Sequence, residues 1–118
     1  MTPVGNERNH MDFEIAADVW KGINASTNDE LRDDLVELAI RYARLRVDHF
    51  RAQTDARIRI DEERTLCHNS FMGSCDILCR NMAKRGENTG WRDLLGHNRK
   101  EIGDFACYLH ALLGISAR

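Results

Sequence analysis

Polar side chains that could do chemistry interrupt an otherwise apolar segment near the middle of the chain. In the stretch RTLCHNSFMGSC, residues 64–75, Arg64 and His68 stand four positions apart. On a helix both would share a side with Cys67 and Phe71 and would face the interior. A buried arginine needs a carboxylate or several carbonyls, because an unpaired buried charge is very costly. The candidate carboxylates for Arg64 are Asp104, Asp93, Glu14 and Asp18.

These residues allow two interpretations. In the first, paired charges and a hydrogen-bonded histidine only fix the register of the helices, as structural polar networks commonly do. In the second, the side chains form a polar pocket between helices that binds a small anion or does acid–base work. The members of this candidate pocket are Arg64, His68, Asn69, Arg99 and Asp104, with His49 from another helix as a further member. We expect the structural interpretation, keep the pocket as the alternative, and assign no catalytic residue.

Metal binding is a separate hypothesis for the same segment. His68, Cys75 and Cys79 share one side of a helix, and Cys107 could add a fourth ligand from elsewhere. Zinc accepts such ligands, but one helix rarely presents three of them around a tetrahedral centre. The sequence has no C-x-x-C pair, and cysteine also packs well as a small buried hydrophobe. We therefore predict no metal site and no cofactor.

Two catalytic patterns are incomplete. Cys67 and His68 are adjacent, so on a helix they diverge by about 100° and do not form a nucleophile–base pair. Helical nucleotide pyrophosphatases hold magnesium with two sets of paired acids, and this chain offers one set, within residues 30–37. Acids at a helix N-terminus also offset the helix dipole. An enzyme is therefore not the leading expectation.

The elements that would position these groups are almost all helical in period. We predict a first helix over about residues 12–23 and a second opened by a capping box of Thr27 and Glu30. A third would run over about 55–84 and end near Gly86. A short helix, WRDLL, would stop at Gly96, and a last helix would run over about 98–114. The predicted fold is all-α, an antiparallel helical bundle of four main helices plus one short helix.

The second helix is apolar around more than half of its circumference, which is typical of a helix that is central in a bundle or covered by a second subunit. Its narrow charged strip contains two pairs four residues apart, Glu37 with Arg41 and Arg44 with Asp48. On the last helix Gly103, Cys107 and Ala111 would form a ridge of small residues, where another helix could approach closely. Both helices favour a homodimer.

The length, charge and composition of the chain indicate the number of domains and the cellular compartment. The chain has 118 residues, one proline and a formal net charge of −2, which suits a single domain over residues 11–118 after a flexible N-terminal leader over residues 1–10. No apolar run approaches the roughly 20 residues that span a bilayer, and no signal peptide is evident. We expect a cytoplasmic protein without a membrane partner, whose four cysteines are free thiols.

The segment over residues 89–106 has the outline of a helix-turn-helix motif. Arg92, Arg99 and Lys100 could contact phosphate there. However, the second helix of this segment is apolar or small on most sides, which suits burial, and the chain has no net positive charge. A DNA-binding regulator is therefore the second alternative, and we do not expect a nucleic-acid partner.

Taken together, RTLCHN and LGHNRKEIGDFACYL resemble a family of small all-helical bacterial proteins of uncharacterised function, over about residues 58–118. The resemblance implies that Arg64, His68, Asn69, Arg99, Gly103 and Asp104 belong to one pattern. It brings no activity with it. Our leading prediction is a non-enzymatic interaction or scaffold protein that self-associates, with a second copy or another protein as its partner.

Overall fold

The computed structural model describes residues 11–116 as five helices with no strand among them. The helices are α2 (Phe13–Asn24), α3 (Asp29–Arg51), α4 (Thr54–Lys84), α5 (Gly90–Leu95) and α6 (Arg99–Ser116). The all-α bundle of four main helices and one short helix is therefore confirmed. The predicted leader over residues 1–10 lies outside the described residues.

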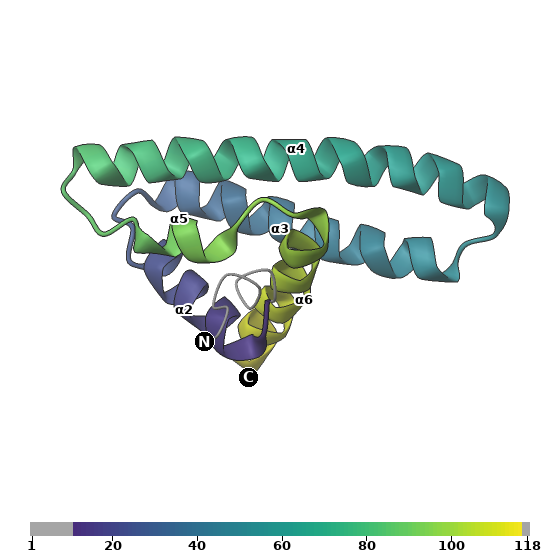
Figure 1. The fold of residues 1–118 in the computed structure, drawn as a ribbon, viewed down its shortest axis with the longest axis horizontal. Helices are drawn as coiled ribbons and strands as arrows, with labels where there is room; N and C mark the ends of the chain where they lie inside the picture. Colours follow the sequence, from purple (N-terminus) through teal and green to yellow (C-terminus); the bar gives the residue numbers. More distant parts are fainter. Residues whose placement is uncertain (1–10, 117–118) are drawn as a thin grey trace, which may run out of the picture.

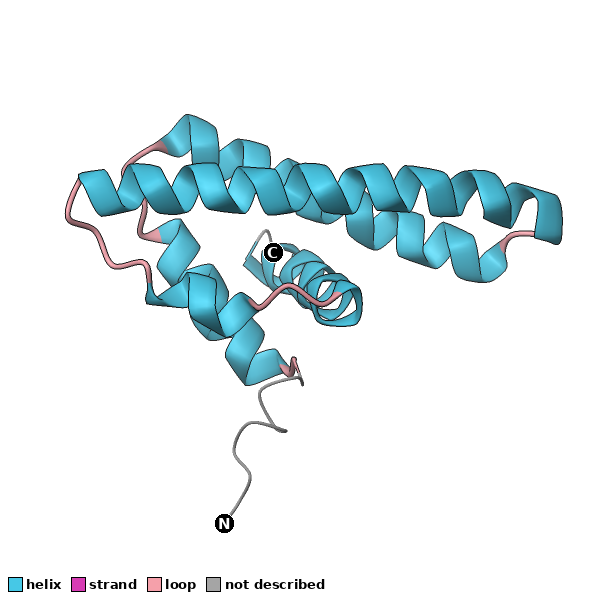
Figure 2. Cartoon of the chain, turned by 45° about the horizontal axis from the view of Figure 1, so that its top comes forward, coloured by secondary structure: helices cyan, strands magenta, loops and turns pink. Residues whose placement is uncertain are grey.

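The long helices α3 and α4 form an antiparallel hairpin, and α2, α5 and α6 lie on one side of it (Figure 1). Turning the molecule shows α6 nearly end-on, so this helix runs across the hairpin and not along it (Figure 2). Within the part of the chain that the structure describes, no helix covers the opposite face of the hairpin. Nor does any helix of residues 11–116 combine the length and apolar character needed to cross a bilayer.

The core lies between the hairpin and the shorter helices. It is built from the faces that the apolar periods predict, because each helix buries residues three or four positions apart. Seven large side chains from the five helices are fully buried at its centre: Val19, Tyr42, Phe71, Leu78, Leu95, Phe105 and Leu109.

Helix ends follow side-chain chemistry, with one correction. The N-cap of α3 is Asn28, whose Oδ1 accepts the backbone N–H of Leu31 at 3.0 Å. The predicted cap at Thr27 was wrong by one residue, because the Thr27 hydroxyl is engaged with Glu87 and Arg85 instead. The predicted stops are confirmed: Gly86 has φ +74° and Gly96 has φ +72°, the left-handed conformation that glycine adopts most easily.

Both features that favoured a homodimer are used within the chain. The broad apolar surface of α3 contacts α4 on one side and α6 on the other, and Ala39 and Ala43 are buried there. The small ridge of α6 receives an arginine, since the Arg46 guanidinium lies 3.1 Å from the position that a Cβ on Gly103 would take. The buried part of α3 and the small ridge of α6 therefore no longer argue for a second subunit.

Two glycines give a matched pair of substitutions that tests the packing of α2 on α5. A methyl group on Gly22 would lie 2.7 Å from Cβ of Trp91, whereas one on Gly73 would meet nothing within 4 Å. We expect Gly22→Ala to lower the free energy of unfolding by about 1–3 kcal/mol through overpacking. Gly73→Ala should raise it by about 0.5–1 kcal/mol, because alanine favours helix. Urea denaturation at low protein concentration measures both, and equal effects would contradict this packing.

Candidate functional site

A cavity of about 400 Å³ opens between the C-terminal half of α3, the N-terminal half of α4 and the first turns of α6. Its basic lining residues are Arg46, His49, Arg57, Arg64, Arg99 and Lys100. Phe50 and Gly103 complete the lining, so the described side chains that form its wall include no carboxylate. We call this the basic cavity.

Helical spacing explains why the cations meet here. On α3, Arg46, His49 and Phe50 are three and four positions apart and share one side of the helix. On α4, Arg57 and Arg64 stand two turns apart on a common side. The start of α6 brings its own cations against both helices because α6 crosses the hairpin (Figure 2).

Asp104 holds one wall of the basic cavity in place. Its Oδ1 accepts a hydrogen bond from Arg46 at 2.7 Å, and its Oδ2 accepts one from Lys100 at 3.1 Å. Gly103 leaves room for the hydrogen bond between Arg46 and Asp104, because the Cβ of a larger residue at position 103 would lie 3.1 Å from the Arg46 guanidinium. Burial alone would raise the pKa of Asp104, but the bonds from Arg46 and Lys100 outweigh it, and the pKa falls below its ordinary value of 3.8.

Asp61 is the second carboxylate at the edge of the cavity. It lies 3.4 Å from Arg64, three residues further along the same helix, and 3.6 Å from Arg99. The predicted acids for Arg64 did not include Asp61, and Asp104 pairs with Arg46 and Lys100 instead. The acid nearest to Arg64 comes from α4 itself, three residues away. The start of α6 lies beside the same side of α4 and adds Arg99 as a second partner of Asp61.

Arg57 joins the two helices of the hairpin at the far wall. Its guanidinium donates to the carbonyl of His49 at 3.2 Å and to that of Phe50 at 3.3 Å. These carbonyls belong to the last turn of α3, where backbone acceptors lack helical partners. Arg57 thus caps α3 with hydrogen bonds, and no carboxylate among residues 11–116 pairs with its positive charge.

The basic cavity has an excess of positive charge. Five permanent cations and one histidine line it, whereas its ion pairs within residues 11–116 involve only Asp61 and Asp104. Arg64 is also incompletely bonded, because its Nε is buried without a partner among the described residues. A buried donor of this kind costs free energy unless something accepts its hydrogen bond.

The structure divides the predicted pocket residues into two groups. Arg64 and Arg99 line the basic cavity, and Asp104 supports its wall. His68 and Asn69 are not among the lining residues: Asn69 is exposed, and the His68 ring packs on Tyr42 with centroids 5.9 Å apart. Burial lowers the pKa of His68 from its ordinary value, the Asn69 amide opposes this shift, and the Arg99 cation adds to it.

The metal-ligand candidates are not brought together. Within residues 11–116 no three histidine, cysteine or acidic side chains gather closely enough to hold an ion, so His68, Cys75, Cys79 and Cys107 do not form one cluster. Burial raises the pKa of Cys75 to about 12. Cys67 donates its thiol to the carbonyl of Leu38 at 3.5 Å, and burial raises its pKa as well. All four cysteines have free thiols, and these two are unreactive.

The helix-turn-helix outline corresponds to α5 and α6, but most of α6 faces the core. Ile102, Phe105 and Leu109 are fully buried on it. Arg92, a predicted phosphate contact, lies 3.3 Å from Asp76 and donates to the carbonyl of Gly96 at 3.0 Å. Its charge therefore serves contacts within the fold.

Five lining residues were missed as pocket members by the sequence prediction: Arg46, Phe50, Arg57, Lys100 and Gly103. A signal existed for Arg57, because an arginine shortly after the end of a helix can bond the last carbonyls of that helix. No comparable signal existed for Lys100, whose place depends on the crossing direction of α6.

Comparisons with protein-family models, with curated proteins and with solved structures gave no match. The function is therefore inferred from the geometry of the chain itself.

Replacing Asp104 by asparagine tests the electrostatic support of the cavity wall. Because the pKa of Asp104 lies below 3.8 in the folded chain, its pairing stabilises the fold above that pH and is lost as the pH falls through the folded value. Asp104→Asn should cost about 1–3 kcal/mol of unfolding free energy near neutral pH, the contribution of charged hydrogen bonds. The loss of stability on acidification should also become smaller. Urea denaturation across pH measures both effects, with exposed Asp48→Asn as the control; identical pH profiles of native and Asp104→Asn chains would contradict the pairing.

Proposed function

We propose that the protein binds a small, multiply charged anion, phosphate or a phosphorylated compound, in the basic cavity. Six basic side chains from three helices converge on one cavity, and no carboxylate of the described residues lines it; this convergence carries the proposal. Arginine guanidinium groups match the oxygens of phosphate and carboxylate with two parallel hydrogen bonds. The cavity contains four arginines, which is more than the two nearby carboxylates neutralise.

Electrostatics supports an anionic occupant. Like charges held close together repel, and partial burial reduces the screening that water provides. The two carboxylates at the cavity edge each already serve two cations. An anion in the cavity would relieve the remaining repulsion.

Size and surroundings favour a small ligand. A volume of about 400 Å³ lies within the range of small-molecule sites, roughly 300–1,000 Å³. Phe50 lines the cavity and is 74% exposed, so its ring offers an apolar surface to the organic part of a phosphorylated compound. The positive end of the α6 dipole adds to the local potential, because Arg99 and Lys100 lie in the first turn of that helix.

The proposed compartment is the cytoplasm. Four free thiols fit a reducing environment, and small phosphorylated compounds are typical cytoplasmic solutes. We propose binding without turnover, because cations dominate the cavity and the buried Cys67 and Cys75 thiols are not nucleophilic.

Calorimetric titration with inorganic phosphate and with pyrophosphate, at constant ionic strength, tests the proposal. Native protein should bind saturably. Arg64→Met or Arg99→Met should weaken binding about 10- to 100-fold, the equivalent of one or two charged hydrogen bonds. The unfolding midpoint should change little, since both arginines lie outside the core.

Arg80→Met is the matched control, because Arg80 is an exposed arginine of α4 that does not line the cavity. Absence of saturable binding by the native chain would overturn the proposal. Equal weakening by Arg80→Met and Arg64→Met would do the same, because it would indicate a diffuse charge effect.

Self-association is the second candidate function, and the outer face of the hairpin favours it. Among the described residues no helix covers that face, and two of its large apolar side chains are strongly exposed, Leu66 at 67% and Ile77 at 47%. Apolar side chains grouped on one face are typical of surfaces that bind another protein. We propose that the chain forms a homodimer.

Sedimentation velocity over a range of protein concentrations tests this second function. We expect a reversible shift from the mass of one chain to that of two as the concentration rises. A single-chain mass up to the solubility limit would contradict self-association and would leave the anion site unaffected.

A further inference from the structure

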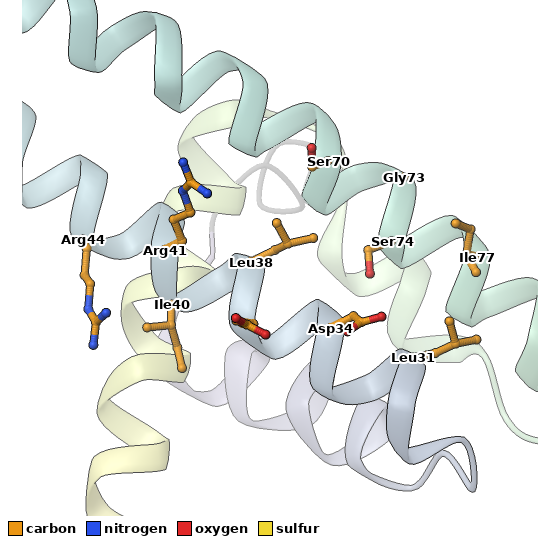
Figure 3. A pocket seen from close by; sticks show the side chains of 11 residues that line it. Leu31, Asp34, Leu38, Ile40, Arg41, Arg44, Ser70, Gly73, Ser74 and Ile77 are labelled. Atoms are coloured by element: carbon orange, nitrogen blue, oxygen red, sulfur yellow. The ribbon is translucent and has the colours of Figure 1, made fainter.

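The outer face of the hairpin carries a groove of about 920 Å³ between α3 and α4 (Figure 3). On the α4 side the wall of the groove is shallow at Ser70, Gly73 and Ser74, because these residues have small side chains or none. A methyl group placed on Gly73 would meet nothing within 4 Å, so this part of the groove is open. Leu31 and Leu38 of α3 provide apolar walls.

A second, smaller hollow continues the groove along α4 and shares residues Leu38, Arg41 and Ser70 with it. It extends to Leu66, one of the most exposed apolar side chains of the described chain. On α4 the two hollows run from Leu66 to Ile77, which is about 16 Å at 1.5 Å per residue, or about three turns of a helix. None of their lining residues lines the basic cavity.

The charges beside the groove follow a symmetric order on α3. Glu37 and Arg41 stand two residues to either side of Ala39, and Asp34 and Arg44 stand five residues to either side. At about 1.5 Å per residue these distances along the helix are about 3 Å and 7.5 Å. The charged residues of α3 that line the groove, which we call the groove strip, therefore have acids in one half and bases in the other half, at matching distances from a common centre.

These four side chains are exposed and available to a partner. The expected pairs of Glu37 with Arg41 and of Arg44 with Asp48 do not form, and within residues 11–116 none of the four residues of the strip takes part in an ion pair. Asp34, Arg41 and Arg44 lie at the groove in Figure 3.

We infer that the groove receives a second copy of this chain, with the two α3 helices antiparallel across a two-fold axis at the level of Ala39. In this register Asp34 meets Arg44 of the second copy, and Glu37 meets its Arg41. The inference rests on the self-association proposed above and names its surface and register.

A two-fold dimer requires a surface that complements itself, with each contact occurring twice. A strip whose acids and bases are arranged symmetrically about one level meets this requirement, whereas a different partner would need no such symmetry. The low α4 side lets the helices of the second copy approach closely. Two hairpins joined in this way form a four-helix bundle, in which exposed apolar residues such as Ile77 become covered.

Charge reversal on opposite halves of the strip tests the register. One variant carries Asp34→Lys and Glu37→Lys, and the other carries Arg41→Glu and Arg44→Glu. Each places like charges opposite each other, so each should raise the dissociation constant of the homodimer at least about tenfold. An equimolar mixture of the two should form a heterodimer, because acids of one chain then meet bases of the other. Sedimentation velocity measures the masses, and circular dichroism checks the helix content. Lys21→Glu is the control, because Lys21 is an exposed residue of α2, which lies on the other side of the hairpin.

A chain with all four reversals restores complementarity and should dimerise about as strongly as the native chain, so a folding defect in one double variant does not decide the result. A native dimer whose dissociation constant neither double variant changes would overturn this surface and leave self-association intact. A native chain that remains monomeric would overturn both. Failure of the mixture to form a heterodimer, with both double variants folded, would overturn the antiparallel register.

Discussion

The unequal lengths of the helices constrain the whole molecule. The hairpin consists of helices of 23 and 31 residues, whereas the helices packed against it have 12, 6 and 18 residues. The short helices can bury one face of the hairpin, and only over part of its length, because α6 crosses it (Figure 1). The basic cavity lies where the start of α6 meets α3 and α4. The groove lies on the face of the hairpin that the short helices do not cover. Both candidate surfaces thus arise from the same mismatch.

Arg46 connects the core to the cavity. Its guanidinium lies on Gly103, bonds Asp104 and also lines the cavity wall. A charged residue at a helix contact is less favourable than an apolar one unless its hydrogen bonds are satisfied. Asp104 accepts one hydrogen bond from Arg46 and offsets part of its charge. The other cations of the cavity add electrostatic repulsion. A local arrangement that disfavours stability is typical of sites kept for function.

The sequence predicted the elements well and the site only in part. Apolar period located all five helices, and Gly86 and Gly96 were correctly predicted to end two of them, since these signals are local. Arg64 and Arg99 were identified as site candidates. Asp61 was not predicted as the partner of Arg64, although a spacing of three residues on one helix is a local signal. Its second ion pair, with Arg99, depends on how α6 crosses α4. Lys100 and Phe50 enter the site for the same reason. Residue spacing determines the side of a helix on which a residue lies, but not the angle at which two helices meet.

The far end of the hairpin contains no buried side chain from Arg46 to Leu66. Such a segment has few contacts to lose, so it can unwind while the rest of the molecule stays folded, and its amide hydrogens should exchange with solvent faster than those of the core. An anion held jointly by α3, α4 and α6 would tie this end to the folded body. Binding of an anion in the basic cavity would then slow the exchange of amide hydrogens and reduce proteolysis at the turn between α3 and α4.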